Sequence, residues 1–244
     1  MNTSALEAKL SAFKLLNMIS EAMGTAFAPY AEATLTVMIE NLDYKFSKKI
    51  RSYALKTLNN LLTAVGEPNN VILFANHYTP AVIKMIQANI ELENVKELKM
   101  ILKGYWNMIK NLNDNNTKGH KAYMNDQVFS TLGPLFNKIL NLVKEAKAKT
   151  LKTIGNKNLD FDEEDLENIK DELAKSTAAS TYVMEISGQL VVNFGAAVAP
   201  MVKTHLLNFF ALNLHGYKNL SESELLDATC FFCDFAEYSY GPLG

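Results

Sequence analysis

The 244-residue chain has little arginine and almost no net charge. Arg51 is its single arginine, so the bidentate guanidinium contacts that read phosphate or guanine are nearly absent. The formal net charge is −2, which provides no general attraction to a polyanion. We therefore expect no direct binding of nucleic acid.

The chain also lacks a long hydrophobic run and a secretory signal. No uninterrupted apolar stretch approaches the ~18 residues that a membrane-spanning helix needs. The N-terminus has no basic region followed by an apolar segment. We expect an intracellular protein that does not span a membrane, and the 48% hydrophobic content excludes a disordered chain.

Proline and glycine are scarce, at six and eleven residues, which favours long helices over a turn-rich β architecture. Five stretches repeat apolar residues at three- and four-residue steps, the period of one helix face. These faces run through Leu6, Leu10, Phe13, Leu16 and Ile19; Ile50, Tyr53, Ala54, Leu58, Leu61 and Leu62; Val95, Leu98, Ile101, Leu102, Tyr105 and Ile109; Tyr182, Ile186, Leu190 and Phe194; and Leu225, Leu226, Thr229, Phe232 and Ala236. We predict a mostly helical protein.

Residues that bind metals or cofactors are few. The only cysteines are Cys230 and Cys233, and the four histidines are scattered, so we expect two buried thiols on one helical face and no metal site. No phosphate-binding glycine loop, His-Glu-x-x-His motif or nucleophile elbow is present. We expect no catalytic residue and no cofactor. An enzyme whose site follows no known motif stays open as a third hypothesis.

Four prolines share one local context. Pro29, Pro80, Pro134 and Pro200 each precede an apolar helical run, at spacings of 51, 54 and 66 residues. Since proline suits the first turn of a helix, each is expected near the start of the second helix of a pair. Stacked helix pairs of ~40–47 residues are typical of HEAT repeats. We expect an all-α HEAT-repeat α-α superhelix, a single solenoid over residues 1–244 with approximate units 1–42, 43–90, 91–158 and 159–215 and a half unit 216–244.

Residues 42–62, LDYKFSKKIRSYALKTLNNLL, resemble a HEAT unit junction. In this resemblance Asp43 opens the turn, Arg51 lies in the first turns of the next helix, and Ala54 and Leu58 face the neighbouring unit. Residues 2–51 as a whole resemble the C-terminal half of importin-β-type nuclear transport receptors. They are most similar to the importin-five, or karyopherin beta-three, branch.

The end of the chain resembles the same branch. In residues 225–239, LLDATCFFCDFAEYS, the positions of Cys230, Phe232, Asp234 and Glu237 match. The acidic stretch DFDEEDLENIKDE, at 160–172, matches in order, whereas the Lys- and Asn-rich residues 110–126 match nothing. Such receptors are longer than 244 residues, so the resemblance implies a C-terminal fragment.

The resemblance implies a protein that works by binding, without chemistry. Cargo proteins with basic import signals would lie in the concave surface, and Ran GTPase in its GTP form would release them by favouring a different curvature. Phe-Gly nucleoporins would insert between first helices on the convex side, and the protein would shuttle between cytoplasm and nucleus. The alternative is a HEAT scaffold of another class, such as a phosphatase subunit or a vesicle-coat or condensin-like adaptor.

Two segments are candidates for partner binding. Residues 160–172 hold eight of the 26 acids and follow a lysine-rich stretch at 138–157. The candidate partner-binding residues are Asp160, Asp162, Glu163, Glu164, Asp165 and Glu167. They favour a negative edge for a basic cargo or a basic face of Ran. The alternative is a solvated insertion whose acids lie at a helix N-terminus, where the helix dipole favours them, and whose two arms attract each other.

The second candidate is the methionine content of the outer helices. Met18, Met23, Met100 and Met108 would suit an adaptable pocket for Phe-Gly repeats. The alternative is that they fill the core between stacked helix pairs.

Overall fold

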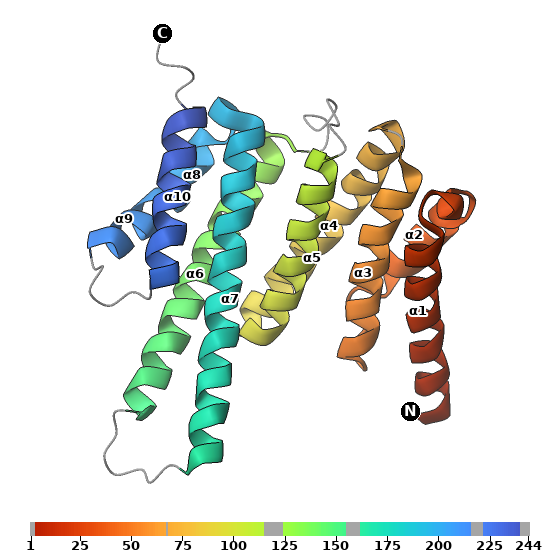
Figure 1. Cartoon of the computed structure of the whole chain (residues 1–244), viewed down its shortest axis with the longest axis horizontal. Coiled ribbons are helices and arrows are strands. Elements are labelled where there is room, and N and C mark those ends of the chain that lie inside the picture. Colours follow the sequence, from red (N-terminus) through yellow and green to blue (C-terminus); the bar gives the residue numbers. More distant parts are fainter. Residues whose placement is uncertain (1–2, 67, 115–123, 155–161, 216–221, 240–244) are drawn as a thin grey trace. The chain divides into compact units, whose positions relative to one another are not determined.

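A computed structural model describes residues 3–66, 68–114, 124–154, 162–215 and 222–239 (Figure 1). Throughout these ranges every regular element is a helix and none is a strand. The elements are α1 (Thr3–Met23), the 3₁₀ helix η1 (Gly24–Tyr30), α2 (Ala31–Glu40), α3 (Lys48–Val65), α4 (Pro68–Glu91), α5 (Val95–Asp114), α6 (Asp126–Ile154), α7 (Glu163–Phe194), the 3₁₀ helix η3 (Gly195–Ala197), α8 (Ala199–His205), α9 (Leu207–His215) and α10 (Glu222–Ser239).

The predicted all-α class is confirmed. Within the described ranges, eight α-helices have ten or more residues, and the α-helices α8 and α9 are shorter. None of the helices in the described ranges is both long enough and apolar enough to span a membrane.

The chain forms two compact units. Unit 1 comprises Met1–Met85 and Lys103–Met124, and unit 2 comprises Ile86–Leu102 and Asn125–Gly244. Helices α4 and α5 therefore contribute residues to both units. The division of the chain into HEAT units stays a prediction.

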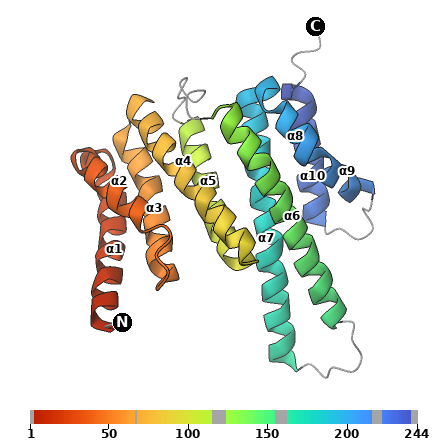
Figure 2. The ribbon, with the colours of Figure 1, turned by 180° about the vertical axis from the view of Figure 1, so that it is seen from behind.

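Helix α3 is the centre of unit 1. Helices α1 and α2 and the segment η1 pack against it, and α1 lies beside α3 in both Figure 1 and Figure 2. The Ser47 hydroxyl accepts a hydrogen bond from the Ile50 amide and caps the N-terminus, and Gly66 ends the helix at φ 62°, in the left-handed region. Ala54 and Leu58 are buried, as predicted.

Unit 2 is built around α6 and α7, which lie side by side in both views. Helix α10 packs on α7 and α9, and α8 packs on α6. The ring centroids of Phe210 in α9 and Phe231 in α10 are 4.4 Å apart. Helix α6 approaches α8 closely at Gly133, where an added Cβ would lie 2.6 Å from His205 Cδ2. This absence of a side chain lets the two helices pack.

The four prolines divide into two pairs. Pro29 lies in η1 just before α2, and Pro200 lies in the first turn of α8, so the prediction is confirmed for both. It is wrong for Pro80 and Pro134, which lie inside α4 and α6.

Both helices continue through the proline because their buried faces continue. In α4, Tyr78, Val82 and Met85 on either side of Pro80 are buried. Burying such side chains contributes about 1.5–3 kcal/mol each. An internal proline costs about 3 kcal/mol through the missing N–H and the ring contact, so burial outweighs it.

The predicted buried face of α10 is wrong. Leu226 is 62% exposed, and Thr229 and Ala236 are exposed as well. The buried residues are Ala228, Phe231 and Phe235, which also recur at steps of three and four. Both the predicted set and the observed set of residues fit the helical period. The observed set faces the core because burying its two phenylalanines removes more apolar area from water.

Candidate functional site

The predicted acidic residues lead into the first turns of α7. The Asp162 carboxylate accepts a hydrogen bond from the Asp165 amide at 2.8 Å and is the N-cap of the helix. Asp162, Glu164, Asp165 and Glu167 are all exposed. Asp160 and the Glu163 side chain lie outside the described residues. The structure thus places four of the six predicted residues together at one helix end.

This helix end belongs to a helical hairpin with little buried surface. The last buried residue described on α6 is Val143, and the first on α7 is Ala179. We call the parts beyond them, residues 144–154 and 162–178, the projecting hairpin. Figures 1 and 2 show these ends of α6 and α7 extending past α10. The described side chains of this hairpin are all exposed or partly exposed, so a partner can reach them.

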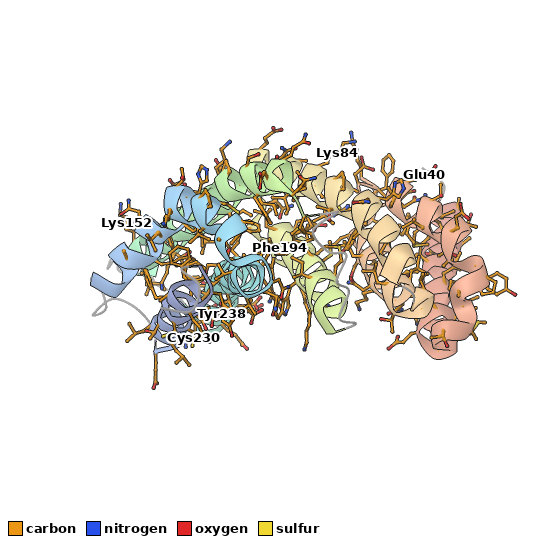
Figure 3. The ribbon with its side chains drawn as sticks, turned by 90° about the horizontal axis from the view of Figure 1, so that it is seen from above. Glu40, Lys84, Lys152, Phe194, Cys230 and Tyr238 are labelled. Atoms are coloured by element: carbon orange, nitrogen blue, oxygen red, sulfur yellow. The ribbon has the colours of Figure 1, made fainter. Side chains whose placement is uncertain are left out.

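The two arms of the projecting hairpin carry opposite charges. Lys144, Lys149 and Lys152 are exposed on the α6 arm, and Lys152 lies in the last turn of that helix (Figure 3). Cations at a helix C-terminus and acids at a helix N-terminus are both favoured by the helix dipoles. The helix dipoles therefore explain why Lys152 lies at the C-terminus of α6 and why Asp162 lies at the N-terminus of α7. Glu164 and Glu167, three residues apart, share one side of α7 and have no cap role.

Among the methionines that the structure describes, the exposed ones lie on α1. Met18 is 54% exposed and lies with Leu15 and Ile19 on the side of α1 away from buried Phe13, and Met23, the last residue of α1, is 38% exposed. Met100 is partly buried, and Met108 is fully buried. For Met108 the structure supports the alternative of the two interpretations, since its side chain fills the core and is not available to a pocket.

The predicted burial of the two cysteines is wrong as well. Cys230 and Cys233 are both exposed, because they flank the Ala228, Phe231 and Phe235 face of α10 that packs on the core. Figure 3 shows Cys230 on α10. Among the residues with a described placement, no group of three His, Cys, Asp or Glu side chains is arranged to hold a metal ion.

Unit 1 buries several polar groups that the sequence pattern did not single out. The Asn59 amide donates to the Gly104 carbonyl at 3.3 Å, and Thr57 and Tyr78 are buried. Burial, assisted by nearby Tyr105, raises the pKa of the Tyr78 hydroxyl far above its usual range. This phenol stays neutral at physiological pH and acts in packing. No spacing rule finds such residues, since they lie within otherwise apolar helix faces.

Comparison of the chain with protein-family models finds no match, and comparison with curated proteins finds none either.

Proposed function

We propose that the chain is part of a nuclear import receptor of the importin-β type, a protein-binding HEAT scaffold controlled by Ran GTPase. Its support is the resemblance of residues 2–51, 160–172 and 225–239 to that family, together with the all-helical architecture. Consecutive helices that lie side by side, such as α6 and α7, are what a HEAT array requires.

The observation that carries the proposal is the exposed acid cluster at the N-terminus of α7. Asp162, Glu164, Asp165 and Glu167 lie in an open part of the fold, where an extended basic segment has access to several of them at once. Opposite charges attract appreciably within a Debye length of ~8 Å at physiological salt. A lysine-rich import signal or a basic face of Ran is the partner chemistry that fits this cluster.

The other elements of the proposal follow from the array. In a stack of helix pairs each pair contacts only its neighbours, so small rotations add along the chain. In our proposal Ran in its GTP form uses this property to release cargo. Phe-Gly nucleoporins are the third partner class, and the protein shuttles between cytoplasm and nucleus.

The test compares three ligands on the immobilised chain: Ran loaded with a non-hydrolysable GTP analogue, Ran loaded with GDP, and a reporter protein that carries a lysine-rich import signal. We expect binding of the import signal and a preference for GTP-loaded Ran over GDP-loaded Ran. A matched reporter whose signal lysines are replaced by serine is the control and should not bind.

Absence of both interactions would contradict the import function and favour a HEAT scaffold of another class. Equal binding of the two Ran forms would show that the nucleotide state of Ran does not control this chain. Binding of the serine reporter would show that the contact does not depend on basic residues.

A further inference from the structure

The connection between α2 and α3, residues 41–47, carries an exposed aromatic ring among lysines. Phe46 is 65% exposed, more than any other aromatic side chain that the structure describes. Lys45 precedes it, and Lys48 and Lys49 follow it in the first turn of α3; all three are exposed. We call Lys45, Phe46, Lys48 and Lys49 the basic loop.

The basic loop joins two helices, α2 and α3, that pack on each other within unit 1. It begins shortly after Glu40, the last residue of α2, which Figure 3 labels. In a stack of helix pairs, neighbouring pairs contact each other through helix faces, and the connections run over the surface. We therefore expect the basic loop to stay accessible to a partner when further helix pairs are stacked on unit 1.

Contacts at Tyr44 hold the connection in one conformation. The Arg51 guanidinium donates a hydrogen bond to the Tyr44 carbonyl at 2.8 Å, and the Tyr44 amide donates to the Asn41 carbonyl at 3.3 Å. The Lys9 ammonium in α1 lies 3.8 Å from the centroid of the Tyr44 ring. Leu42 is buried and anchors the start of the connection. A segment fixed before binding loses little conformational entropy when a partner binds.

The Phe46 ring is positioned by the same residue. Its centroid lies 5.6 Å from that of the Tyr44 ring, with the two planes at 70°, which is an edge-to-face contact. This contact orients the ring and leaves most of it accessible. An aromatic ring held in place is a common anchor of binding surfaces, because a partner that covers it removes a large apolar area from water.

The charges beside Phe46 are mainly positive. Residues 41–51 contain four basic residues and a single acid, Asp43. The helix dipole does not explain Lys49, since it disfavours cations in the first turn of a helix. A partner with carboxylates complements this charge, and lysine ammonium groups pair with carboxylates without demanding one fixed orientation.

We propose that the basic loop binds an acidic peptide segment of a partner protein, in which a large apolar residue lies among glutamates or aspartates. The apolar residue packs on the accessible part of the Phe46 ring, and the carboxylates lie beside Lys45 and Lys49. A single-stranded nucleic acid fits this loop less well. Its bases stack on successive aromatic rings, whereas Lys9 already lies over the Tyr44 ring. The contact requires neither Ran nor an import signal, so it does not depend on the function proposed above.

The test titrates the chain into a fluorescent peptide in which one leucine is flanked on both sides by glutamates, and it follows the fluorescence anisotropy at low salt. Two control peptides have the same length. In one, serine replaces the leucine; in the other, glutamines replace the glutamates. We expect the first peptide to bind, each control to bind about tenfold more weakly or not at all, and added salt to weaken the binding.

The aromatic anchor is tested by Phe46→Ala, which should weaken binding of the glutamate–leucine peptide about tenfold. Leu92→Ala is the control, since Leu92 is 74% exposed in the connection between α4 and α5, and this change should leave the binding as it is. Thermal unfolding checks that both variants are folded.

The lysines are tested by Lys45→Gln combined with Lys49→Gln. This variant should bind the peptide about three- to tenfold more weakly, and its binding should depend less on salt. The charge-matched control combines Lys149→Gln with Lys152→Gln, two exposed lysines of the projecting hairpin. The control should bind the peptide as the natural chain does.

Hydrogen exchange locates the contact, and we expect the peptide to protect backbone amides within residues 44–51. No binding of the glutamate–leucine peptide at low salt would overturn the proposal, and so would binding that Phe46→Ala leaves unchanged. Loss of binding only in the projecting-hairpin control would place the acidic peptide there and overturn the proposal as well. A single-stranded oligonucleotide that binds more tightly than the peptide, and is weakened by the same basic-loop variants, would assign the loop to nucleic acid instead.

Discussion

The Asn60 side-chain amide donates a hydrogen bond to the backbone carbonyl of Asn17, 3.2 Å away, and thereby ties α3 to α1. The same amide lies 3.1 Å from Ser20 Oγ, which itself donates to the Asn17 carbonyl at 2.9 Å. Asn17 and Ser20 are buried. Helix α1 is thus held to the rest of unit 1 by polar contacts as well as by Phe13.

Replacing Asn60 tests how much these contacts stabilise unit 1. Asn60→Ala should lower the free energy of unfolding by about 1–3 kcal/mol, since partly buried acceptors lose their donor. Asn141→Ala is the control, because exposed Asn141 donates to Asn137 one turn away within α6, and it should change stability by about 0.5 kcal/mol or less. Denaturant unfolding measures both. Equal effects would show that Asn60 has no special role.

Leu58→Ala tests the core of unit 1. Leu58 is buried in the middle of α3, so the change should cost about 2–5 kcal/mol as a large-to-small core substitution. In a stacked array the loosening should stay local. Hydrogen exchange should rise in α1, α2 and α3 and not in α7 and α10. Equal loosening of both sets of helices would contradict the stacked array.

Gly133→Ala tests the close contact of α6 with α8. The new Cβ would lie 2.6 Å from His205 Cδ2 and 2.7 Å from Met201 Cγ, so we expect a loss of about 1–3 kcal/mol. Gly188→Ala in α7 is the matched control. Its Cβ would meet only Asp234 Oδ2, at 3.5 Å, and alanine in a helix interior is favoured by about 0.5–1 kcal/mol. Thermal unfolding should give opposite signs, and a shared sign would contradict the packing described.

Asp234→Asn tests the pH dependence of stability. Partial burial, reinforced by the nearby Glu237 charge, raises the pKa of the Asp234 carboxyl above its ordinary value. The folded state therefore holds this proton more tightly than the unfolded state, and the ionised carboxylate destabilises the fold as pH rises above about 4. The variant should be more stable than the natural chain at neutral pH. Its advantage should shrink as pH falls through the raised pKa of the folded state toward about 4, and it should be lost below that pH.

Glu237→Gln provides the comparison for this prediction. This variant removes the Glu237 charge, which is the smaller cause of the raised Asp234 pKa, and leaves Asp234 partly buried. It should therefore raise stability at neutral pH by less than Asp234→Asn does. Unfolding at a series of pH values measures both variants. An advantage for Asp234→Asn that is the same at every pH would contradict a titrating origin.

The helical class could be predicted because apolar spacing along α3 and α5 leaves one possible buried face. In α10 two sets of residues fit the same helical spacing. The set with Phe231 and Phe235 is the buried one, and Phe231 packs against Phe210. The helix boundary predicted at Pro80 was wrong. The preference of proline for the first turn of a helix was outweighed by the burial of side chains on both sides of it.

The candidate site was only partly predictable. The acid run was visible in the sequence, and the N-terminal position of Asp162 follows from ordinary capping preferences. A solvated insertion with two oppositely charged arms was one of the two interpretations of the sequence. How far the projecting hairpin extends was not predictable, because it depends on where α10 stops covering α7. The apolar face predicted for α1 is wrong at Ile19, which fits the period of the buried row but is 37% exposed at its border.

The most direct test of the central claim neutralises the exposed acids at the start of α7 and measures the association rate with a lysine-rich import signal and with GTP-loaded Ran. Asp162→Asn and Asp165→Asn are combined with Glu164→Gln and Glu167→Gln, since asparagine still caps a helix. The control carries Glu7→Gln, Glu32→Gln, Glu40→Gln and Glu91→Gln, four exposed acids elsewhere, so both chains change from a net charge of −2 to +2.

Only the first variant should associate more slowly, its deficit should shrink as salt is added, and its melting temperature should hardly change. Equal association rates for the two variants and the natural chain at low salt would contradict a partner-binding role for this acid cluster.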